Sequence, residues 1–382
     1  MKWKGKAEEK DQTGLELESQ MWQLPTSHKM PRLTWWWWFW LFFIKNEENL
    51  SQPKQLMILW STKNCSFIEV NDYQWSRKGG IHTSGNQTVF DGMACSWYYD
   101  GEKMHHPFTF HRKWFESSFE PGILDDGKLA PLHGKNLTFQ GNKREYSLYL
   151  ASKNARTTLD LRMKSEGKLS RYEHSANSWY RNFGFDILKL KRMKLGGRIN
   201  GPNGPENVEG TAYFQKVMVN APAPPWYWST VHFDDGSYLQ YFMPHLGFPI
   251  FRRHDTHRSG FDKYVKFLST TMDYYDSVDG RMHKFKKVAM NKYISSNGWP
   301  VFKLQAKSRN KSIDITLDTY SGAAWQFHQP LLFSFMKSYL CYYEYPAIVT
   351  QFRFKDGSDT VRRLRDHGGG YGNCEHSWGL LF

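Results

Sequence analysis

The chain has few cysteines and no secretory signal, and each absence excludes a class of protein. Its 382 residues include four cysteines, Cys65, Cys95, Cys341 and Cys374, which lie far apart and form no Cys-x-x-Cys pair. This spacing suggests neither a zinc knuckle nor a disulfide framework, so a reducing compartment is the simpler expectation. The N-terminal residues mix lysine with glutamate and lack the apolar core of a secretory signal. We therefore expect a cytoplasmic protein.

The sequence also lacks an apolar run long enough for a membrane helix. The run Trp35 to Ile44 reads WWWWFWLFFI and has ten residues, whereas a spanning helix needs about 20. As a strand it would extend about 33 Å, at ~3.3 Å per residue. A continuous apolar run is typical of a strand that is buried on both faces. We predict a barrel strand here, with residues 55–62 as its hairpin partner.

Motifs for cofactor chemistry are missing. The chain has no Gly-x-Ser-x-Gly, no Gly-x-Gly-x-x-Gly between a strand and a helix, and no Gly-Lys-Ser/Thr. Two histidine groups lack a full set of metal ligands in a recognised spacing, and arginines flank the first of them. We therefore expect no cofactor and no metal. The two groups are His254 with His257, and His105 with His106 and His111.

Aromatic residues and basic charge are abundant. The 17 Trp, 21 Tyr and 27 Phe exceed what a core needs, and such rings suit partly wet cavities. The net charge is +14, and basic runs occupy residues 189–198 and 281–292. The usual explanation of such runs is a solvated strand face. The alternative is peripheral contact with an anionic membrane surface; nucleic acid is the weaker second alternative.

The clearest fold signal lies between Val208 and His245. An Asp235-Gly236 turn separates two aromatic runs, which is the strongest short-range hairpin signal. Residues 226–233 and 237–242 should therefore pair antiparallel. Short strands at 8 to 12 residue spacing fill most of the remaining chain, as in sandwiches and barrels. Helical periodicity is confined to 259–276 and 330–338.

The aromatic strand and turn of the first half recur about half a chain later, which suggests a tandem pair of barrels. The segment Ala221 to Pro225, APAPP, marks the joint because its prolines cannot donate to a ladder. We predict an all-β protein with a flexible leader over 1–29, a first barrel over 30–222 and a second over 223–382.

Five landmarks in order between Arg32 and Phe382 resemble the two-domain lipocalin-like proteins of the AttH and carotenoid 1,2-hydratase (CrtC-like) group. They are the Trp-rich opening strand, Val208–Tyr213, Trp226–Trp228 with Asp234–Ser237, Tyr293–Pro300 and Gly370–Glu375. The resemblance implies two lipocalin-like antiparallel barrels. It also implies a function: to bind or transform a largely apolar small molecule, isoprenoid, terpenoid or polyketide-like, near the domain junction.

One departure from this family bears on catalysis. In the hydratase branch, an aspartate after the Gly-x-Ala-Tyr strand is implicated in protonating an alkene. Gln215 stands at that position and has no proton to give. The family's opening glutamate is also absent, with Thr34 in its place. Cofactor-free hydratase, lyase or cyclase chemistry thus needs another acid, and a non-catalytic lipid-binding protein is the alternative.

Glu375 and His376 end a glycine-rich strand, and because neighbours on a strand point to opposite faces, one of them faces the cavity. Glu375 is the candidate acid; its alternative is a strand-end carboxylate held by a neighbour. Gln215 is a candidate hydrogen-bonding group or a solvent-facing one. The catalytic candidates are thus Glu375, Gln215 and His376. Aromatic residues expected to line the ligand, or else to pack the cores, are Tyr213, Trp226, Trp228, Tyr241, Trp36 and Trp38.

Overall fold

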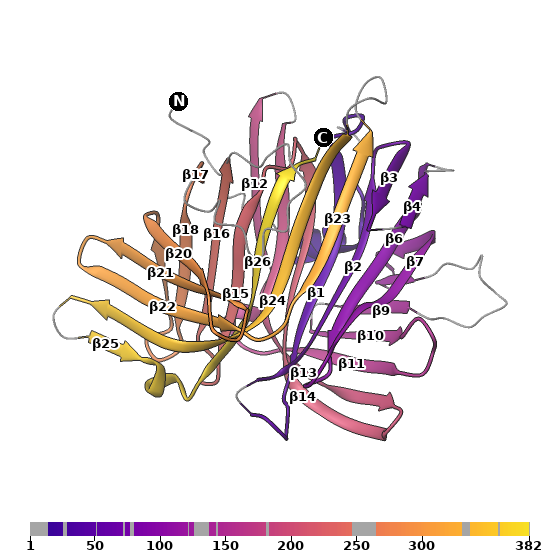
Figure 1. The fold of residues 1–382 in the computed structure, drawn as a ribbon. Coiled ribbons are helices and arrows are strands. Elements are labelled where there is room, and N and C mark those ends of the chain that lie inside the picture. Colours follow the sequence, from indigo (N-terminus) through magenta and orange to yellow (C-terminus); the bar gives the residue numbers. More distant parts are fainter. Residues whose placement is uncertain are drawn as a thin grey trace.

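The chain folds almost wholly into antiparallel strands, as the sequence predicts (Figure 1). The computed structural model describes residues 14–381 except 26–28, 51, 72, 77–79, 121, 126–136, 143, 181–182, 247–264, 331–336 and 358–359. The strands form two large sheets, which lie side by side.

The first sheet closes into a barrel of ten strands, because β11 pairs with both β10 and β13. The predicted hairpin is confirmed: β1 pairs with β2 from Trp35 opposite Lys63 to Ile44 opposite Lys54. In ring order the strands are β1 (Thr34–Ile44), β2 (Lys54–Lys63), β6 (Gln87–Tyr99), β7 (Met104–Ser118), β8 (Ile123–Asp125), β9 (Leu137–Asn142), β10 (Glu145–Ala151), β11 (Thr158–Ser165), β13 (Phe183–Gly201) and β14 (Gly204–Asn220). Attached to the ring are β5 (Ile81–Ser84) on β6 and β12 (Glu173–Tyr180) on β13.

The tryptophan run of β1 explains the contact between the two sheets. Trp36, Trp38 and Trp40 belong to the core inside the first barrel. Trp35 and Phe39, on the opposite face, belong to a core that the first barrel shares with the second sheet. Both faces of β1 are therefore buried, which is why its sequence has no polar alternation.

The second sheet has β15 and β26 at its centre and encloses a third core. The predicted hairpin at Asp235-Gly236 is confirmed by the pairing of β15 with β16. In spatial order the strands are β19 (Arg281–Phe285), β18 (Thr271–Asp276), β16 (Tyr238–Leu246), β15 (Trp226–Phe233), β26 (Gly370–Leu380), β24 (Lys337–Asp356), β22 (Lys311–Thr319), β21 (Pro300–Ser308) and β20 (Val288–Ile294). Short strands β17 (Lys266–Phe267), β23 (Ala323–Pro330) and β25 (Thr360–Arg363) extend it, and 3₁₀ turns cover Lys168–Ser170 and Leu364–His367.

Two strands from the first half of the chain join the second sheet. β3 (Phe67–Val70) pairs with β23, and β4 (Tyr73–Ser76) pairs with β3. The two halves are thus joined by strand pairing as well as by the shared core, and the domain boundary near residue 222 stays a prediction.

Three expectations differ from the structure. Within the expected flexible leader, Gly14–Trp22 forms helix α1, and Met21 and Trp22 are buried in the first barrel. The helix expected over 259–276 is absent where the chain is described, since β18 alternates buried and half-buried residues with a period of two. Residues 330, 337 and 338 belong to β23 and β24, and 331–336 lie outside the described residues. No described helix is both long and apolar enough to cross a bilayer.

Candidate functional site

Two glutamates face each other where the barrels meet. Glu344 of β24 lies directly opposite Glu375 of β26, so the Cβ atoms of this cross-strand pair are separated by about 4.5–5.5 Å. Both side chains are buried, with 0% and 6% of their surface exposed. Two carboxyl groups in so apolar a place cannot both ionise cheaply.

Glu375 is held by one indole. Trp226 Nε1 donates a hydrogen bond of 2.7 Å to Glu375 Oε2. Burial raises the pKa of Glu375 to about 7, and the Trp226 bond offsets part of that rise. The sequence leaves open which of Glu375 and His376 faces the cavity; in the structure Glu375 lies at the junction beside Trp226.

Glu344 is held from the other barrel. The indole of Trp97, on β6, donates to Glu344 Oε2 across the interface. Burial raises the pKa of Glu344 well above its ordinary value, and the charge of Glu375 raises it further, while Trp97 and the nearby Trp325 favour the charged form. Glu344 Oε1 has no partner of hydrogen-bonding geometry in the described chain. Near neutral pH the pair therefore holds at least one proton.

Aromatic rings surround the pair. Trp228 lies opposite Glu375 on β15, and its ring centroid is 6.1 Å from that of Phe39 and 5.4 Å from that of Tyr213. The ring of Tyr342 lies 6.1 Å from that of Trp226. These side chains give the pair an apolar wall contributed by both sheets.

Gln215 faces the same junction but does not reach the carboxyl groups through any described bond. Tyr213 Oη donates to Gln215 Oε1 at 3.0 Å and accepts from Gln240 Nε2 at 3.2 Å. Lys189 Nζ in turn donates to Gln240 Oε1 at 3.2 Å. Gln215 therefore belongs to a series of hydrogen-bonded side chains at the edge of the site. Its amide accepts a hydrogen bond there and cannot act as an acid.

The other candidates lie elsewhere. His376 points into the second sheet's own core, where its ring stacks on Tyr227 at 4.1 Å. Tyr241 lies in that core too. Trp36 and Trp38 lie inside the first barrel and donate to the carbonyl oxygens of Pro25 and Met21. Of the predicted residues, the junction thus brings together Glu375, Trp226, Trp228, Tyr213 and Gln215.

The sequence reasoning missed Glu344 and Trp97. Glu344 sits in CYYEYPAIV, where it is the one charged residue of an aromatic and aliphatic stretch. A carboxylate in such a stretch is costly to bury and therefore informative. No local signal exists for Trp97, because its role depends on the packing of two sheets.

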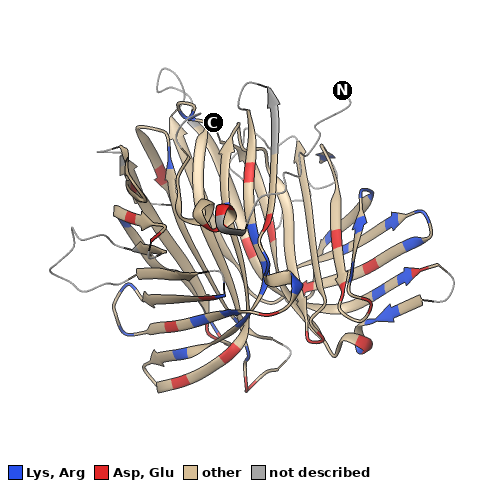
Figure 2. Cartoon of the chain, turned by 180° about the vertical axis from the view of Figure 1, so that it is seen from behind, with Lys and Arg blue, Asp and Glu red and all other residues tan. Residues whose placement is uncertain are grey.

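The described histidines of the two groups have hydrogen-bond partners within the chain, and contact of the basic runs with an anionic surface stays a prediction. His105 bonds to Asp100 Oδ2 and His106 to the carbonyl of Ala324, and the group at 254–257 lies outside the described residues. The described residues contain no group of three or more acidic, histidine or cysteine side chains placed to hold a metal. Basic and acidic side chains are interspersed along the strands (Figure 2), and Lys191 pairs with Glu173 at 2.5 Å.

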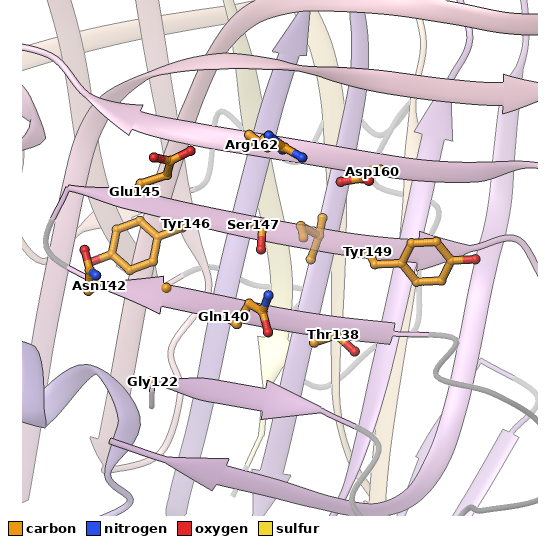
Figure 3. A pocket seen from close by; sticks show the side chains of 12 residues that line it. Gly122, Thr138, Gln140, Asn142, Glu145, Tyr146, Ser147, Tyr149, Asp160 and Arg162 are labelled. Atoms are coloured by element: carbon orange, nitrogen blue, oxygen red, sulfur yellow. The ribbon is translucent and has the colours of Figure 1, made fainter. Parts of the chain in front are cut away.

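A separate depression of about 680 Å³ lies on the outside of the first barrel (Figure 3). It runs across β9, β10 and β11, and β13 separates β11 from the junction strand β14. The polar side chains of Gln140, Ser147 and Arg162 lie opposite one another on these strands and form one row. Its lining residues are Gly122, Thr138, Gln140, Gly141, Asn142, Glu145, Tyr146, Ser147, Leu148, Tyr149, Asp160 and Arg162.

Comparison with known proteins gives structural likeness only. No protein-family model matches the sequence, and no curated protein matches it. A candidate AttH protein from Nitrosomonas europaea superposes with a TM-score of 0.47 at 12% identity, covering 92% of this chain and 96% of its own. Kievitone hydratase from Nectria haematococca gives a TM-score of 0.39 at 12% identity, covering 94% and 93%. The first of these carries the name of the group that the sequence motifs resemble.

Proposed function

We propose that this protein binds an apolar, unsaturated small molecule at the junction of its barrels and adds water to it, or removes water from it, without a cofactor. The observation that carries the proposal is the buried pair of Glu344 and Glu375. An isoprenoid or polyketide-like ligand fits the apolar wall. The pair supplies the proton that an alkene or a leaving hydroxyl group requires.

The surroundings of the pair favour an apolar ligand that enters from one side. Phe242, Trp228, Glu375 and Glu344 form a single row across β16, β15, β26 and β24. The row begins at the surface, since Phe242 is 42% exposed, and ends at fully buried Glu344. A ligand that displaces water from Phe242 and Trp228 would gain about 25 cal/mol per Å² of apolar surface buried.

The proposed step uses both carboxyl groups. The protonated member donates its proton to one carbon of a C=C bond, and the π electrons form the new C–H bond. The cation left on the neighbouring carbon faces the indoles of Trp226 and Trp228, whose electron-rich faces stabilise it. A water molecule forms the C–O bond and gives its proton to the ionised carboxylate. The pair ends with one proton, as it began, and the reverse sequence eliminates water.

The raised pKa values suit this task. An ordinary glutamic acid is almost fully ionised at pH 7, whereas a pair whose lower member titrates near 7 keeps an acid and a base side by side. Positioned acid and base groups typically contribute about 10²–10⁴-fold to a rate. The opposed glutamates thus do what Gln215 cannot.

The test is hydration in oxygen-18 water. Purified protein is incubated with farnesol and with geranylgeraniol, both of which carry trisubstituted double bonds, and products are analysed by mass spectrometry for one labelled water. We expect a labelled alcohol whose rate of formation falls about 100-fold or more in Glu344→Gln and in Glu375→Gln. The matched control is Glu209→Gln, which changes an exposed glutamate paired with Lys45.

Two results would overturn the proposal. Equal rates in the wild type and both junction variants would remove the pair from the chemistry. Co-purification or tight binding of an isoprenoid that the wild type leaves unchanged would assign the junction to ligand carriage instead of catalysis. Circular dichroism of each variant separates these outcomes from unfolding.

A further inference from the structure

The depression on the outside of the first barrel is shaped by one short side chain among longer ones (Figure 3). Ser147 lies at the middle of β10 and is half-buried. Glu145 and Tyr149, two residues away on either side, lie on the same face of the strand and are exposed. Gln140 of β9 and Arg162 of β11 lie directly opposite Ser147. Longer side chains thus surround Ser147, and its hydroxyl forms the floor of the hollow.

The polar groups of this hollow keep unused hydrogen-bonding capacity. Within the described residues, the side chains of Gln140, Ser147 and Arg162 have no hydrogen-bond or ion-pair partner. They present an amide and a hydroxyl, which both donate and accept, and a guanidinium, which only donates. Asp160, opposite Tyr149 on β11, adds acceptor oxygens. A bound molecule can therefore bond to these groups without breaking a bond inside the chain.

A buried hydroxyl marks one end of the hollow. Thr138 of β9 lies opposite Tyr149 and lines the depression. Thr138 is 9% exposed, and its Oγ1 has no partner of hydrogen-bonding geometry within the described chain. Buried polar atoms in native structures are normally paired, so an unmatched one calls for an explanation. A polar molecule bound at this end of the hollow is one explanation that the lining residues allow.

Tyr149 presents an aromatic ring beside these polar groups. The residue is 38% exposed, and its ring lies at the same end of the hollow as Thr138 (Figure 3). A tyrosine combines an apolar ring with a polar tip. A ligand that covers the exposed ring would gain about 25 cal/mol per Å² of apolar surface buried. The best ligand therefore has an apolar face as well as polar groups.

The charges of the lining are of both signs. Glu145 and Asp160 are acidic, and Arg162 is basic. Lys164 of β11 pairs with Glu145 at 3.6 Å. An anion would lie against two carboxylates, and a wholly apolar molecule would cover polar groups without bonding to them, which is costly. A neutral molecule with several hydroxyl groups suits the set, because a hydroxyl can donate to a carboxylate and accept from a guanidinium or an amide.

We propose that this hollow is a carbohydrate site, in which one ring of a neutral oligosaccharide lies over Ser147. The hydroxyl groups of the sugar bond to Gln140, Asp160 and Arg162, and the C–H groups on one face of its ring pack on Tyr149. The volume of about 680 Å³ lies within the usual range of ligand pockets. The site is separate from the junction, since none of its lining residues belongs to the strands that carry the glutamate pair. It would let the protein hold a sugar whether or not the junction is occupied.

The test is saturation-transfer NMR of the purified full chain, with maltotriose, cellotriose and mannotriose as neutral probes and trigalacturonate as an anionic one. We expect at least one neutral trisaccharide to bind with a dissociation constant of about 1 mM or tighter. Raising the NaCl concentration about tenfold should change that constant by less than about twofold, because salt screens only charged partners. Binding of no neutral probe, or tighter binding of trigalacturonate than of all three, overturns the proposal.

Two variants locate the bound sugar. Tyr149→Ala should weaken binding about tenfold, because the apolar platform is lost. Its matched control is Tyr293→Ala, which removes a tyrosine of similar exposure, 41%, from β20 of the second sheet. Ser147→Leu fills the floor of the hollow from the outer face of the barrel and should abolish binding. Unchanged binding in both Tyr149→Ala and Ser147→Leu would place the sugar elsewhere and overturn the proposal.

Two further measurements keep the result decisive. If either variant fails to fold, as judged by circular dichroism, the wild type decides: the sugar must shift the backbone amide signals of residues 145–149, and unmoved signals contradict the site. Glu375→Gln should bind the sugar as the wild type does. Failure of the carbohydrate site would therefore leave the role of the glutamate pair untouched.

Discussion

Glu344 and Glu375 oppose each other on adjacent strands, and each is held by a tryptophan from a different element: Trp97 of the first barrel bonds Glu344, and Trp226 of the second sheet bonds Glu375. The pair lies within the second sheet, but its bond to Trp97 forms only when the two sheets pack. Its acid–base state and the integrity of the junction should change together.

The first prediction concerns the dependence of stability on pH. The pKa of Glu375 is raised from its ordinary 4.5 to about 7 in the folded protein, so the native state binds more protons than the unfolded state between these values. The free energy of unfolding should fall as pH rises from about 4.5 to 7, by on the order of 3 kcal/mol from this group. Urea unfolding at several pH values measures it.

Glu375→Gln is the comparison for that series. Glutamine cannot ionise, so the variant should lose this contribution and show a flatter profile than the wild type over the same window. The difference between the two profiles isolates Glu375 from other titrating groups. Parallel profiles would show that Glu375 ionises in the folded protein as readily as in the unfolded one.

The second prediction concerns helix α1. Lys216 is buried inside the first barrel, where its ammonium donates to the carbonyl oxygens of Gln20 and Gln23 at the end of the helix. Burial lowers the pKa of Lys216 to about 7. Lys216→Met should cost about 2 kcal/mol, the scale of hydrogen bonds from a charged group, and should loosen the helix.

Hydrogen–deuterium exchange measures that loosening. Amides of residues 14–25 should exchange faster in Lys216→Met, while the barrel strands keep their protection. The control is Lys194→Met, which changes an exposed lysine on the neighbouring strand β13. Equal protection of the helix in both variants would mean that the burial of Met21 and Trp22 is enough to hold helix α1 in place.

The third prediction concerns close strand packing at Gly210. A Cβ atom built at this position lies 1.9 Å from the carbonyl oxygen of Phe43 on β1, whereas one built at Gly196 meets nothing closer than 3.9 Å. Gly210→Ala should therefore destabilise the first barrel by about 1–3 kcal/mol, as overpacking does, while Gly196→Ala should change stability little. Thermal unfolding of the two variants gives the comparison; equal melting temperatures would contradict it.

Local pattern was enough for much of the fold. The alternation, the Asp235-Gly236 turn and the tryptophan run each predict a strand or hairpin that the structure contains, because these signals depend on neighbours in sequence. The helix expected over 259–276 is wrong for the described residues of this range, 265–276. Apolar residues there alternate with a period of two, and a short stretch of such alternation resembles one face of a helix.

Only some residues of the site could be predicted from the sequence. Glu375 could be singled out because it follows the glycine-rich run at residues 368–372, and Trp226 because it opens an aromatic strand. Glu344 lies on a different strand, and its pairing with Glu375 follows from strand order in a 14-stranded sheet. Trp97 comes from the other barrel altogether. Contacts that depend on how distant strands are ordered leave no trace in local pattern.

The measurement that tests the central claim most directly is a titration of the glutamate side-chain carboxyl carbons by NMR, on the wild type and on Glu375→Gln. In the wild type the signals of Glu344 and Glu375 should report a pair that still holds a proton at neutral pH, and in the variant the pKa of Glu344 should fall because the charge of Glu375 is gone. Two independent titrations near 4.5 in the wild type would contradict the account.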